Sequence, residues 1–374
     1  MVDKKMMNEM NINNEKKKVE KLDSLVEETH TVFALRSCLT SQYNGSFDND
    51  NRPRYIAGTK RIIGSQFSEK RKIRDFLELK GGKIFIKKGN RKEFVDAFIK
   101  EYFSHYTKEQ LKEESVKKEI FKALIEYYDD LTTFGVTLSV SDMNDSYTGP
   151  IQFNDTISLN DVYSNEYDAS VTSCLREFKK RESKDDVDKL KSGGGVGKFY
   201  KVSYALMAAI ATILPQIREE YNLKYRDIKK FDVASILAPS RMKTTSKAGI
   251  ETELYFRVES KTNFFVLRDL RFEFKFIPLK DPSQILYYED YEIDVTGVIR
   301  LLRKNLKHIK AFYIYDTEML DYFIKNRDGE ESERMSFKDI IKTHIPEIKL
   351  VEIDPHEDIE KGYYVDDGGD FGEQ

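Results

Sequence analysis

The sequence predicts a globular α+β protein, because segments typical of buried strands and segments typical of amphipathic helices follow one another along the chain. Residues 31–40 form a β-branched and apolar run that favours a buried strand. Residues 65–79 have the apolar spacing of an amphipathic helix. The chain has 374 residues, 40% of them hydrophobic, and is therefore long enough to bury a substantial core.

The core is expected to begin near residue 31, after a polar N-terminal extension over residues 1–30. Residues 41–64 are rich in Asn, Asp, Gly and Pro, which predicts a long loop. In the helix that follows, the residues expected on the apolar face are Phe67, Ile73, Phe76 and Leu77. The basic residues expected on its other faces are Lys70, Arg71 and Arg74.

Two further helices, over residues 91–106 and 108–130, are expected to form a helical insertion. Thr107 and Gln110 have the spacing of a capping box at the start of the second helix. Residues 134–140 alternate as a strand, and residues 151–159 form another extended segment after a Gly-Pro break.

The second half of the chain begins with a strongly polar stretch over residues 167–200, which predicts a protruding hairpin. Residues 203–221 are apolar and are expected to form a helix bent at Pro215. Residues 250–260 and 269–277 alternate as paired strands. Residues 295–307 are expected to form a helix that leads into a strand over residues 311–315.

Several kinds of site find little support in the sequence. No apolar run approaches the roughly 18 residues that a membrane span needs, so we expect a cytoplasmic protein. The two cysteines, Cys38 and Cys174, are too few for a disulfide framework and lack zinc-site spacing. The five histidines show no ligand spacing either, and we expect no metal and no cofactor. Residues 192–198 lack the spacing of a phosphate-binding loop.

Positive charge is concentrated in two segments, although the formal net charge is -3. Eight basic residues occur between positions 52 and 74, where Glu69 is the single acidic residue. Residues 241–247 are also rich in basic side chains, together with hydroxyl side chains. An acidic tail over residues 351–374 offsets the positive charge of both segments in the net charge of the chain. A solvated helix face would explain one such segment. Two of them favour a nucleic-acid partner, because phosphate binding needs several cations together with small polar donors.

Four separated segments resemble the guide-wrapping backbone subunit of type I CRISPR Cascade complexes, a member of the RAMP superfamily. Residues 43–77 resemble its amino-terminal signature, and residues 148–153 (Thr-Gly-Pro-Ile-Gln-Phe) resemble its Thr-Gly-Pro-Val-Gln-Phe segment. Residues 197–206 resemble its segment after the hairpin, and residues 244–249 resemble its Ser-Lys-x-Gly loop. The four segments also occur in the same order as in the family, and they resemble its type I-B members most.

The resemblance implies a ferredoxin-like (RRM-like) palm over residues 31–330, interrupted by the helical insertion over residues 91–130 and by a thumb hairpin over residues 167–197. Residues 331–374 would form a C-terminal segment with the acidic tail. The implied function is antiviral defence, in which copies of the chain hold the backbone of one guide CRISPR RNA (crRNA) and leave its bases free to pair with target DNA. The implied partners are the crRNA, the target DNA, further copies of the chain, and the large, guide-5′-end-capping and guide-processing subunits.

The same resemblance implies which side chains contact the RNA. Those positioning guide phosphates would be Arg52, Arg54, Lys60, Arg61, Ser65, Gln66, Lys70, Arg71 and Arg74. Those lining the other side of the guide would be Arg241, Lys243, Ser246 and Lys247. In the thumb, Leu175 or Phe178 would be an apolar wedge that stabilises an unstacked step of the RNA.

Two alternatives remain open at the level of the sequence. A type III relative of similar fold cuts target RNA with a loop aspartate, and Asp48 or Asp50 would then be catalytic. Asn- and Asp-rich turns also carry such residues for backbone capping alone. The second alternative is a general RNA-binding protein that does not polymerise. We expect a subunit that is not an enzyme, since hydrolysis would defeat the purpose of holding a guide.

Overall fold

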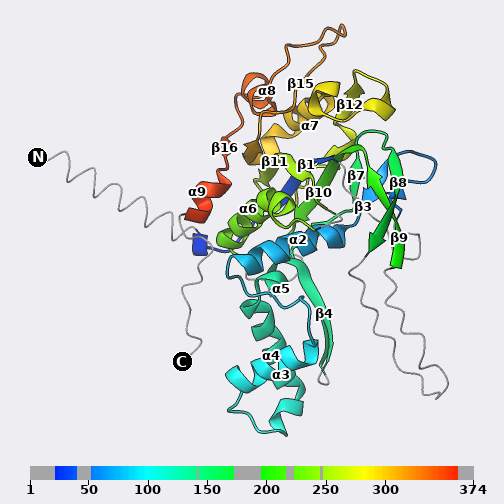
Figure 1. Ribbon diagram of the computed structural model, residues 1–374. Coiled ribbons are helices and arrows are strands. Elements are labelled where there is room, and N and C mark those ends of the chain that lie inside the picture. The colour runs from blue at the N-terminus through cyan, green and yellow to red at the C-terminus, as the bar shows by residue number, and fades with distance from the viewer. Residues whose placement is uncertain are drawn as a thin grey trace, which may run out of the picture.

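One large sheet forms the middle of the molecule, and its described strands follow the order β16-β14-β11-β1-β10-β7-β3-β2, with β6 also pairing with β10 (Figure 1). The computed structural model describes residues 22–39, 52–140, 143–171, 195–215, 223–244 and 247–360. The strands of this sheet are β1 (His30–Leu39), β2 (Arg54–Tyr55), β3 (Ile62–Gly64), β6 (Ile151–Phe153), β7 (Thr156–Ser158), β10 (Tyr204–Ile213), β11 (Ile250–Ser260), β14 (Ile309–Asp316) and β16 (Leu350–Glu352). The mixture of sheet and helices confirms the predicted α+β class at this coarse level.

Strand β1 lies at the centre of the sheet and confirms the strand predicted over residues 31–40. It pairs antiparallel with β10 along all ten of its residues and with β11 on its other side. Its side chains alternate between the two faces, so that Phe33 and Leu35 enter one core while Val32 and Ala34 enter the other. Both faces are covered, which explains why the strand is an almost continuous apolar run.

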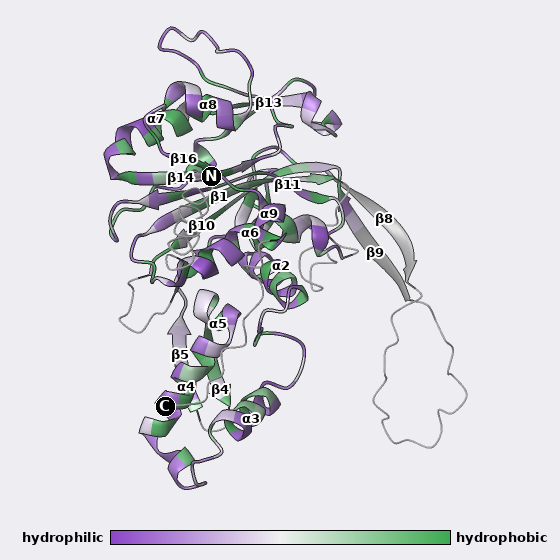
Figure 2. Cartoon of the chain, turned by 90° about the vertical axis from the view of Figure 1, so that its left-hand side faces the viewer, coloured by the Kyte–Doolittle hydropathy of each residue, from purple (hydrophilic) through white to green (hydrophobic). Residues whose placement is uncertain are grey.

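Helices α2 (Gln66–Leu79), α6 (Tyr225–Arg241) and α9 (Pro355–Glu360) cover one face of the sheet (Figure 2). The helix predicted over residues 65–79 is confirmed by α2. The expectation that Phe67 shares its apolar face is wrong, because Phe67 is 73% exposed. At 100° per residue, Phe67 points roughly 120° away from the direction shared by Ile73, Phe76 and Leu77.

The opposite face of the sheet is covered by α7 (Thr296–Asn305), α8 (Phe337–His344) and a small sheet of β12 (Lys275–Pro278), β13 (Tyr291–Asp294) and β15 (Tyr322–Phe323). Short 3-10 helices in this layer are η3 (Leu270–Phe272), η4 (Pro282–Gln284), η5 (Tyr288–Asp290) and η6 (Leu306–His308). The ring of Phe256 is 4.8 Å from that of Phe312 and 5.5 Å from that of Phe337. The predicted helix over residues 295–307 and the strand after it are confirmed by α7 and β14.

The helical insertion extends away from the sheet below α2 (Figure 1). Its elements are α3 (Arg91–Tyr102), η2 (Gln110–Lys112), α4 (Glu114–Tyr127), α5 (Asp129–Phe134), β4 (Gly135–Val140) and β5 (Met143–Thr148). It has its own apolar core, in which Phe98, Ile120 and Leu138 are buried. The second predicted helix is interrupted, and the Thr107–Gln110 capping box forms on η2, with bonds of 2.8 and 3.3 Å. Strand β5 was not predicted.

The predicted helix over residues 203–221 is wrong in its described part, because residues Tyr204–Ile213 form β10 beside β1. The run contains four alanines among its ten residues, and alanine favours helices in isolation. All but one of the ten residues are buried, since β10 is covered on both faces. Continuous apolar runs of this length do not by themselves distinguish a buried strand from a buried helix.

Three other predictions need smaller corrections. Residues 269–277 do not pair with β11, because η3 occupies part of this range and β12 pairs with β13 instead. The predicted loop over residues 41–64 contains the paired strands β2 and β3. The extended segment over residues 151–159 is divided into β6 and β7.

A second antiparallel pair, β8 (Ser164–Val171) and β9 (Gly195–Val202), projects from the edge of the large sheet (Figures 1 and 2). Its register runs from Ser164↔Val202 to Val171↔Gly195. This pair corresponds to the predicted hairpin, and the glycine-rich residues 195–198 lie in strand β9. The wedge candidates Leu175 and Phe178 lie outside the described residues.

None of the described helices is both long and apolar enough to cross a membrane. The C-terminal segment adds β16 and α9 to the edge of the sheet and to the α6 layer. Most of the predicted acidic tail, from residue 361 onward, lies outside the described residues.

We expect Asp232→Ala to lower the free energy of unfolding by about 3–5 kcal/mol, because it leaves a buried guanidinium uncompensated. Asp232 accepts hydrogen bonds from Arg257 Nε at 3.0 Å, from Arg257 Nη2 at 2.9 Å and from Tyr255 at 2.6 Å. The Arg257 side chain is 5% exposed. Urea denaturation provides the measurement.

The control for this prediction is Asp358→Ala, which breaks the less buried Lys229–Asp358 ion pair of 2.7 Å. This variant is expected to lower the free energy of unfolding by about 1 kcal/mol or less. Equal losses of unfolding free energy in the two variants would contradict the larger contribution expected of the buried contacts between Asp232, Arg257 and Tyr255.

Candidate nucleic-acid interface

Helix α2 and its capping residue carry five of the thirteen predicted RNA-contact residues, and the local sequence explains where the helix begins. The Ser65 side chain accepts a hydrogen bond from the Phe67 amide at 3.2 Å and caps the helix. The Asp155 carboxylate accepts from the Gln66 amide at 3.0 Å. Side-chain oxygens therefore already satisfy these two backbone amides at the start of the helix.

A buried carboxylate joins the inner side of α2 to the sheet. Glu69, 2% exposed, forms ion pairs with Arg36 of β1 and with Lys72, whose ammonium is 3.2 Å from it. Burial alone would raise the pKa of Glu69, but the neighbouring Arg36 and Lys72 charges outweigh this and lower it to about 2. The only acidic residue between positions 52 and 74 thus holds two cations inside the protein.

The second basic segment meets the first on the surface of α2. The Lys247 ammonium donates a hydrogen bond to the hydroxyl of Ser68. Burial and the charge of Lys72 lower the pKa of Lys247 to about 8. Gly249 has a φ of 79°, and a Cβ atom there would lie 2.2 Å from the Leu39 carbonyl oxygen at the end of β1. Lys247 and Gly249 therefore bring the second basic segment beside Ser68 of α2 and beside the end of the central strand.

Two predicted contact residues are mainly structural. Lys70 is 8% exposed, and its ammonium donates to Gln152 Oε1 at 2.8 Å. Burial and the charge of Arg74 lower the pKa of Lys70 to about 8. Arg74 donates to the fully buried Asp130 carboxylate at 2.8 Å. Lys70 therefore joins α2 to β6 of the large sheet, and Arg74 joins α2 to α5 of the helical insertion. The expectation that Lys70 lies away from the buried face of α2 is wrong.

The β2–β3 hairpin contributes further cations at the rim of the sheet. Arg54 and Lys60 are exposed, and Arg61 is partly exposed. The Lys60 ammonium donates to the Tyr163 hydroxyl at 2.9 Å, and Arg52 Nε donates to the Tyr200 hydroxyl at 3.0 Å. These two contacts link the basic hairpin to the base of the β8–β9 pair.

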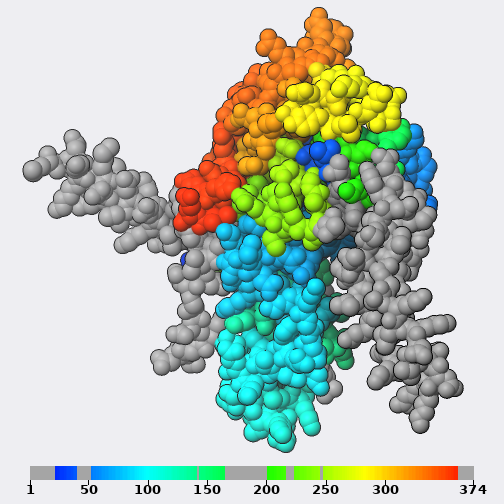
Figure 3. Space-filling view, in the orientation of Figure 1, coloured from blue at the N-terminus to red at the C-terminus, as the bar shows by residue number. Residues whose placement is uncertain are grey.

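Exposed cations also lie on α2 and at or just after the C-terminal end of α6, and these two helices lie side by side (Figure 3). The Arg71 side chain is 45% exposed and is 2.7 Å from Asp75. The Lys243 side chain is 53% exposed and is 3.6 Å from Glu251, and Arg241 is exposed as well. Exposed ion pairs of this kind are worth roughly 0–1 kcal/mol, so a phosphate can replace the carboxylate at little cost.

Some predicted site residues lie outside the described part of the chain. They are Asp48, Asp50, Leu175, Phe178 and Ser246. Among the residues that the structure describes, no group of three His, Cys, Asp or Glu side chains could hold a metal ion. Sequence reasoning missed Tyr163 and Asp155, whose contacts with Lys60 and Gln66 join segments about 90 or more residues apart.

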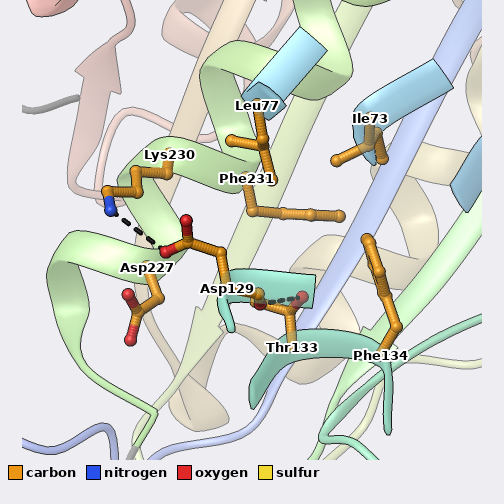
Figure 4. Close-up of a pocket in the computed structure, with 8 residues that line it drawn as sticks. All are labelled: Ile73, Leu77, Asp129, Thr133, Phe134, Asp227, Lys230 and Phe231. Carbon is orange, nitrogen blue, oxygen red and sulfur yellow. Dashed lines mark hydrogen bonds and ion pairs between the residues drawn. The ribbon is translucent and has the colours of Figure 1, made fainter. Parts of the chain in front are cut away.

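A small pocket marks the joint between the helical insertion and the two helices on the sheet (Figure 4). Ile73 of α2, Phe231 of α6 and Phe134 of α5 supply its apolar walls. At its rim the Lys230 ammonium is 3.2 Å from Asp129, and burial raises the pKa of Asp227 to about 6. With an apolar interior and two carboxylates at its edge, this pocket is a packing joint and not an anion site.

An antiparallel α+β protein with exposed cations gathered at one end of its central strand has the arrangement of a nucleic-acid-binding protein. The family model described as CRISPR-associated protein Cas7 matches residues 28–296. The chain belongs to the Cas7 family, which confirms the family predicted from the sequence.

The chain is also similar to individual known proteins. A CRISPR-associated protein Cas7 of Haloferax volcanii is 26% identical over 312 residues, which cover 78% of this chain and 86% of that protein. Two solved structures, each 12% identical, also match. A chain of a "CRISPR RNA-guided surveillance complex, pre-nicking" has a TM-score of 0.45 and covers 80% of this chain and 97% of its own. A chain of a "CRISPR RNA-guided surveillance complex" has a TM-score of 0.44, with coverages of 78% and 89%.

We expect the stabilising effect of Glu69 to depend on pH. Its pKa of about 2 in the folded protein lies below the usual value of 4.5, so its contribution is present above about pH 5 and is lost as the pH falls toward 2. Wild type should be more stable than Glu69→Gln at pH 6, and this difference should shrink by about 3 kcal/mol by pH 2. Urea denaturation across this pH range measures it.

If the difference in free energy of unfolding between wild type and Glu69→Gln did not change with pH, the lowered pKa of the Glu69 carboxylate would be contradicted. The control is Glu78→Gln, which removes a carboxylate that is 42% exposed on the same helix. Its effect on the free energy of unfolding is expected to stay within about 0.5 kcal/mol.

Proposed function

We propose that this Cas7-family protein binds the backbone of a guide crRNA as repeated copies and forms the filament of a type I CRISPR surveillance complex. The observation that carries the proposal is the contact between Lys247 and Ser68, because it brings the two basic segments to one surface. A single-stranded RNA lying over this surface would meet cations from α2, from the loop after α6 and from the β2–β3 hairpin. The family assignment supports the crRNA as that RNA.

The strand order supports a ferredoxin-like palm. Along the chain the core elements are β1, α2, β6 with β7, β10, α6 and β11, and in space their strands lie in the order β11-β1-β10-β6/β7. Every neighbouring pair in this set is antiparallel, and both helices pack on the same face. This order is consistent with a β-α-β-β-α-β arrangement in which the helical insertion comes between α2 and β6. The β8–β9 pair between β7 and β10 then corresponds to the thumb.

The chemistry of the surface favours binding without sequence readout. Lysine and arginine side chains contact phosphates, which are the same in every nucleotide, so such contacts fix position but carry no sequence information. Bases that remain uncovered can pair with target DNA, and base pairing supplies the specificity. We infer a type I-B complex in the cytoplasm, with the large, guide-5′-end-capping and guide-processing subunits as further partners.

We propose that the protein holds RNA and does not cut it. The alternative, cleavage of target RNA by Asp48 or Asp50 as in a type III relative, is not favoured by the family assignment. Asp48 and Asp50 lie outside the described residues, in the stretch of sequence between the end of β1 and Arg52, so the alternative calls for a direct test.

We expect Arg71→Glu combined with Lys243→Glu to weaken guide binding by tenfold or more while the fold stays intact, because both side chains are exposed. The slope of log affinity against log salt should fall by roughly 1.4, for two lost phosphate contacts on a single strand. Lys70 is kept unchanged in this variant, because reversal of its buried charge would also disturb folding. Fluorescence anisotropy at several salt concentrations measures both quantities.

The matched control is Lys325→Glu combined with Lys342→Glu, which reverses two cations that also lie in exposed ion pairs but belong to the C-terminal part of the chain. It should leave the affinity and the salt slope near wild type. An equal loss in the control would mean that overall charge, and not this surface, governs RNA binding.

We expect the assembled guide complex to leave complementary RNA intact in the presence of a divalent metal ion. The observation against this proposal would be regularly spaced cuts that disappear on substitution of Asp48→Ala or Asp50→Ala. Gel electrophoresis of end-labelled target RNA measures the outcome, and complementary DNA serves as the control for guide pairing.

A further inference from the structure

Phe67 is a large apolar side chain that the fold leaves in solvent. It lies in the first turn of α2 and is 73% exposed, whereas Ile73, Phe76 and Leu77 of the same helix are at most 3% exposed. The core therefore does not need an aromatic residue at position 67. Single exposed apolar residues are common on protein surfaces, so exposure alone assigns no function.

The neighbours of Phe67 distinguish it from an ordinary exposed residue. Ser68, the next residue, accepts a hydrogen bond from Lys247 on the other basic segment. Arg71 lies one helical turn further along the same face and is 45% exposed. Phe67 therefore lies on a part of α2 that has cations from two separate parts of the chain close by.

An exposed aromatic side chain with cations nearby matches the two surfaces of a single-stranded nucleotide. The cations attract the phosphate, and the ring offers a flat apolar face on which an unpaired base can stack. Such stacking is tolerant of sequence, because every base has a π face. A protein partner would instead be expected to cover a larger apolar area than one isolated ring.

We propose that Phe67 is a base-stacking residue for single-stranded RNA whose phosphates are held by Arg71 and Lys247. The inference rests on the proposed guide-binding function and adds to it a contact with a base. It implies that one nucleobase for each copy of the protein lies against α2.

The first test compares binding of a short oligouridylate to wild type, Phe67→Ala and Phe264→Ala. Phe264 is a matched control because it is 90% exposed and lies in the loop beside the start of β1. The loop around Lys247 lies beside the end of β1, about 30 Å away for a ten-residue strand. We expect Phe67→Ala to weaken binding about 5- to 100-fold and Phe264→Ala to leave it unchanged.

The second test uses the absence of tryptophan from the chain. Phe67→Trp creates a single indole, which keeps a stacking surface and reports directly on it. We expect this variant to retain wild-type affinity for oligouridylate and its fluorescence to be quenched on binding. An oligomer of the same length with abasic sites should bind more weakly to wild type. The same oligomer should not quench the indole fluorescence of the Phe67→Trp variant.

The outcomes separate this inference from the proposed function. The stacking assignment would be overturned if Phe67→Ala bound oligouridylate with the affinity of wild type. It would also be overturned if wild type bound the abasic and base-bearing oligomers with equal affinity. Either result would leave guide binding in place. Failure of wild type to bind any oligomer would overturn both. If Phe67→Ala binds the oligomer normally but no longer assembles on a long guide, Phe67 contacts another copy of the chain and the assignment to a base is wrong.

Discussion

The ion pair between Glu69 and Arg36 is the interaction on which the candidate interface depends. Arg36 lies on the central strand, and Glu69 lies in the first turn of α2, so the pair fixes the helix to the sheet. Removal of one partner from a buried pair leaves an uncompensated charge, which makes the geometry of such a pair costly to change. Because this inner side of α2 is fixed, the side that carries Phe67 and Arg71 is held toward solvent.

Positive charge serves two purposes in this protein. Buried cations such as Lys72 and Arg74 are paired with carboxylates and hold the layers together. Exposed cations such as Arg71 and Lys243 form weak surface pairs that a phosphate can replace. The basic segment between residues 52 and 74 therefore contains both kinds, although its composition suggests a uniform surface.

The Thr-Gly-Pro-Ile-Gln-Phe segment also has a structural purpose, which explains its residue types. A Cβ atom on Gly149 would lie 2.3 Å from the Gly135 amide nitrogen, so the chain at this joint has no room for a side chain. Gln152 accepts from Lys70 and donates to the Gly149 carbonyl at 2.7 Å. The segment connects the helical insertion, α2 and the sheet.

The sequence by itself determined the strand β1, the helices α2 and α7, the polar hairpin and the family, because these depend on local periodicity, capping residues and short motifs. It did not determine β10, whose alanine-rich run becomes a strand only because β1 and the layers above and below cover it. It also could not separate Lys70 from Arg71, which are adjacent in the chain but differ in burial. Burial depends on contacts with residues about 80 positions away, such as Gln152, and only the tertiary structure brings these together.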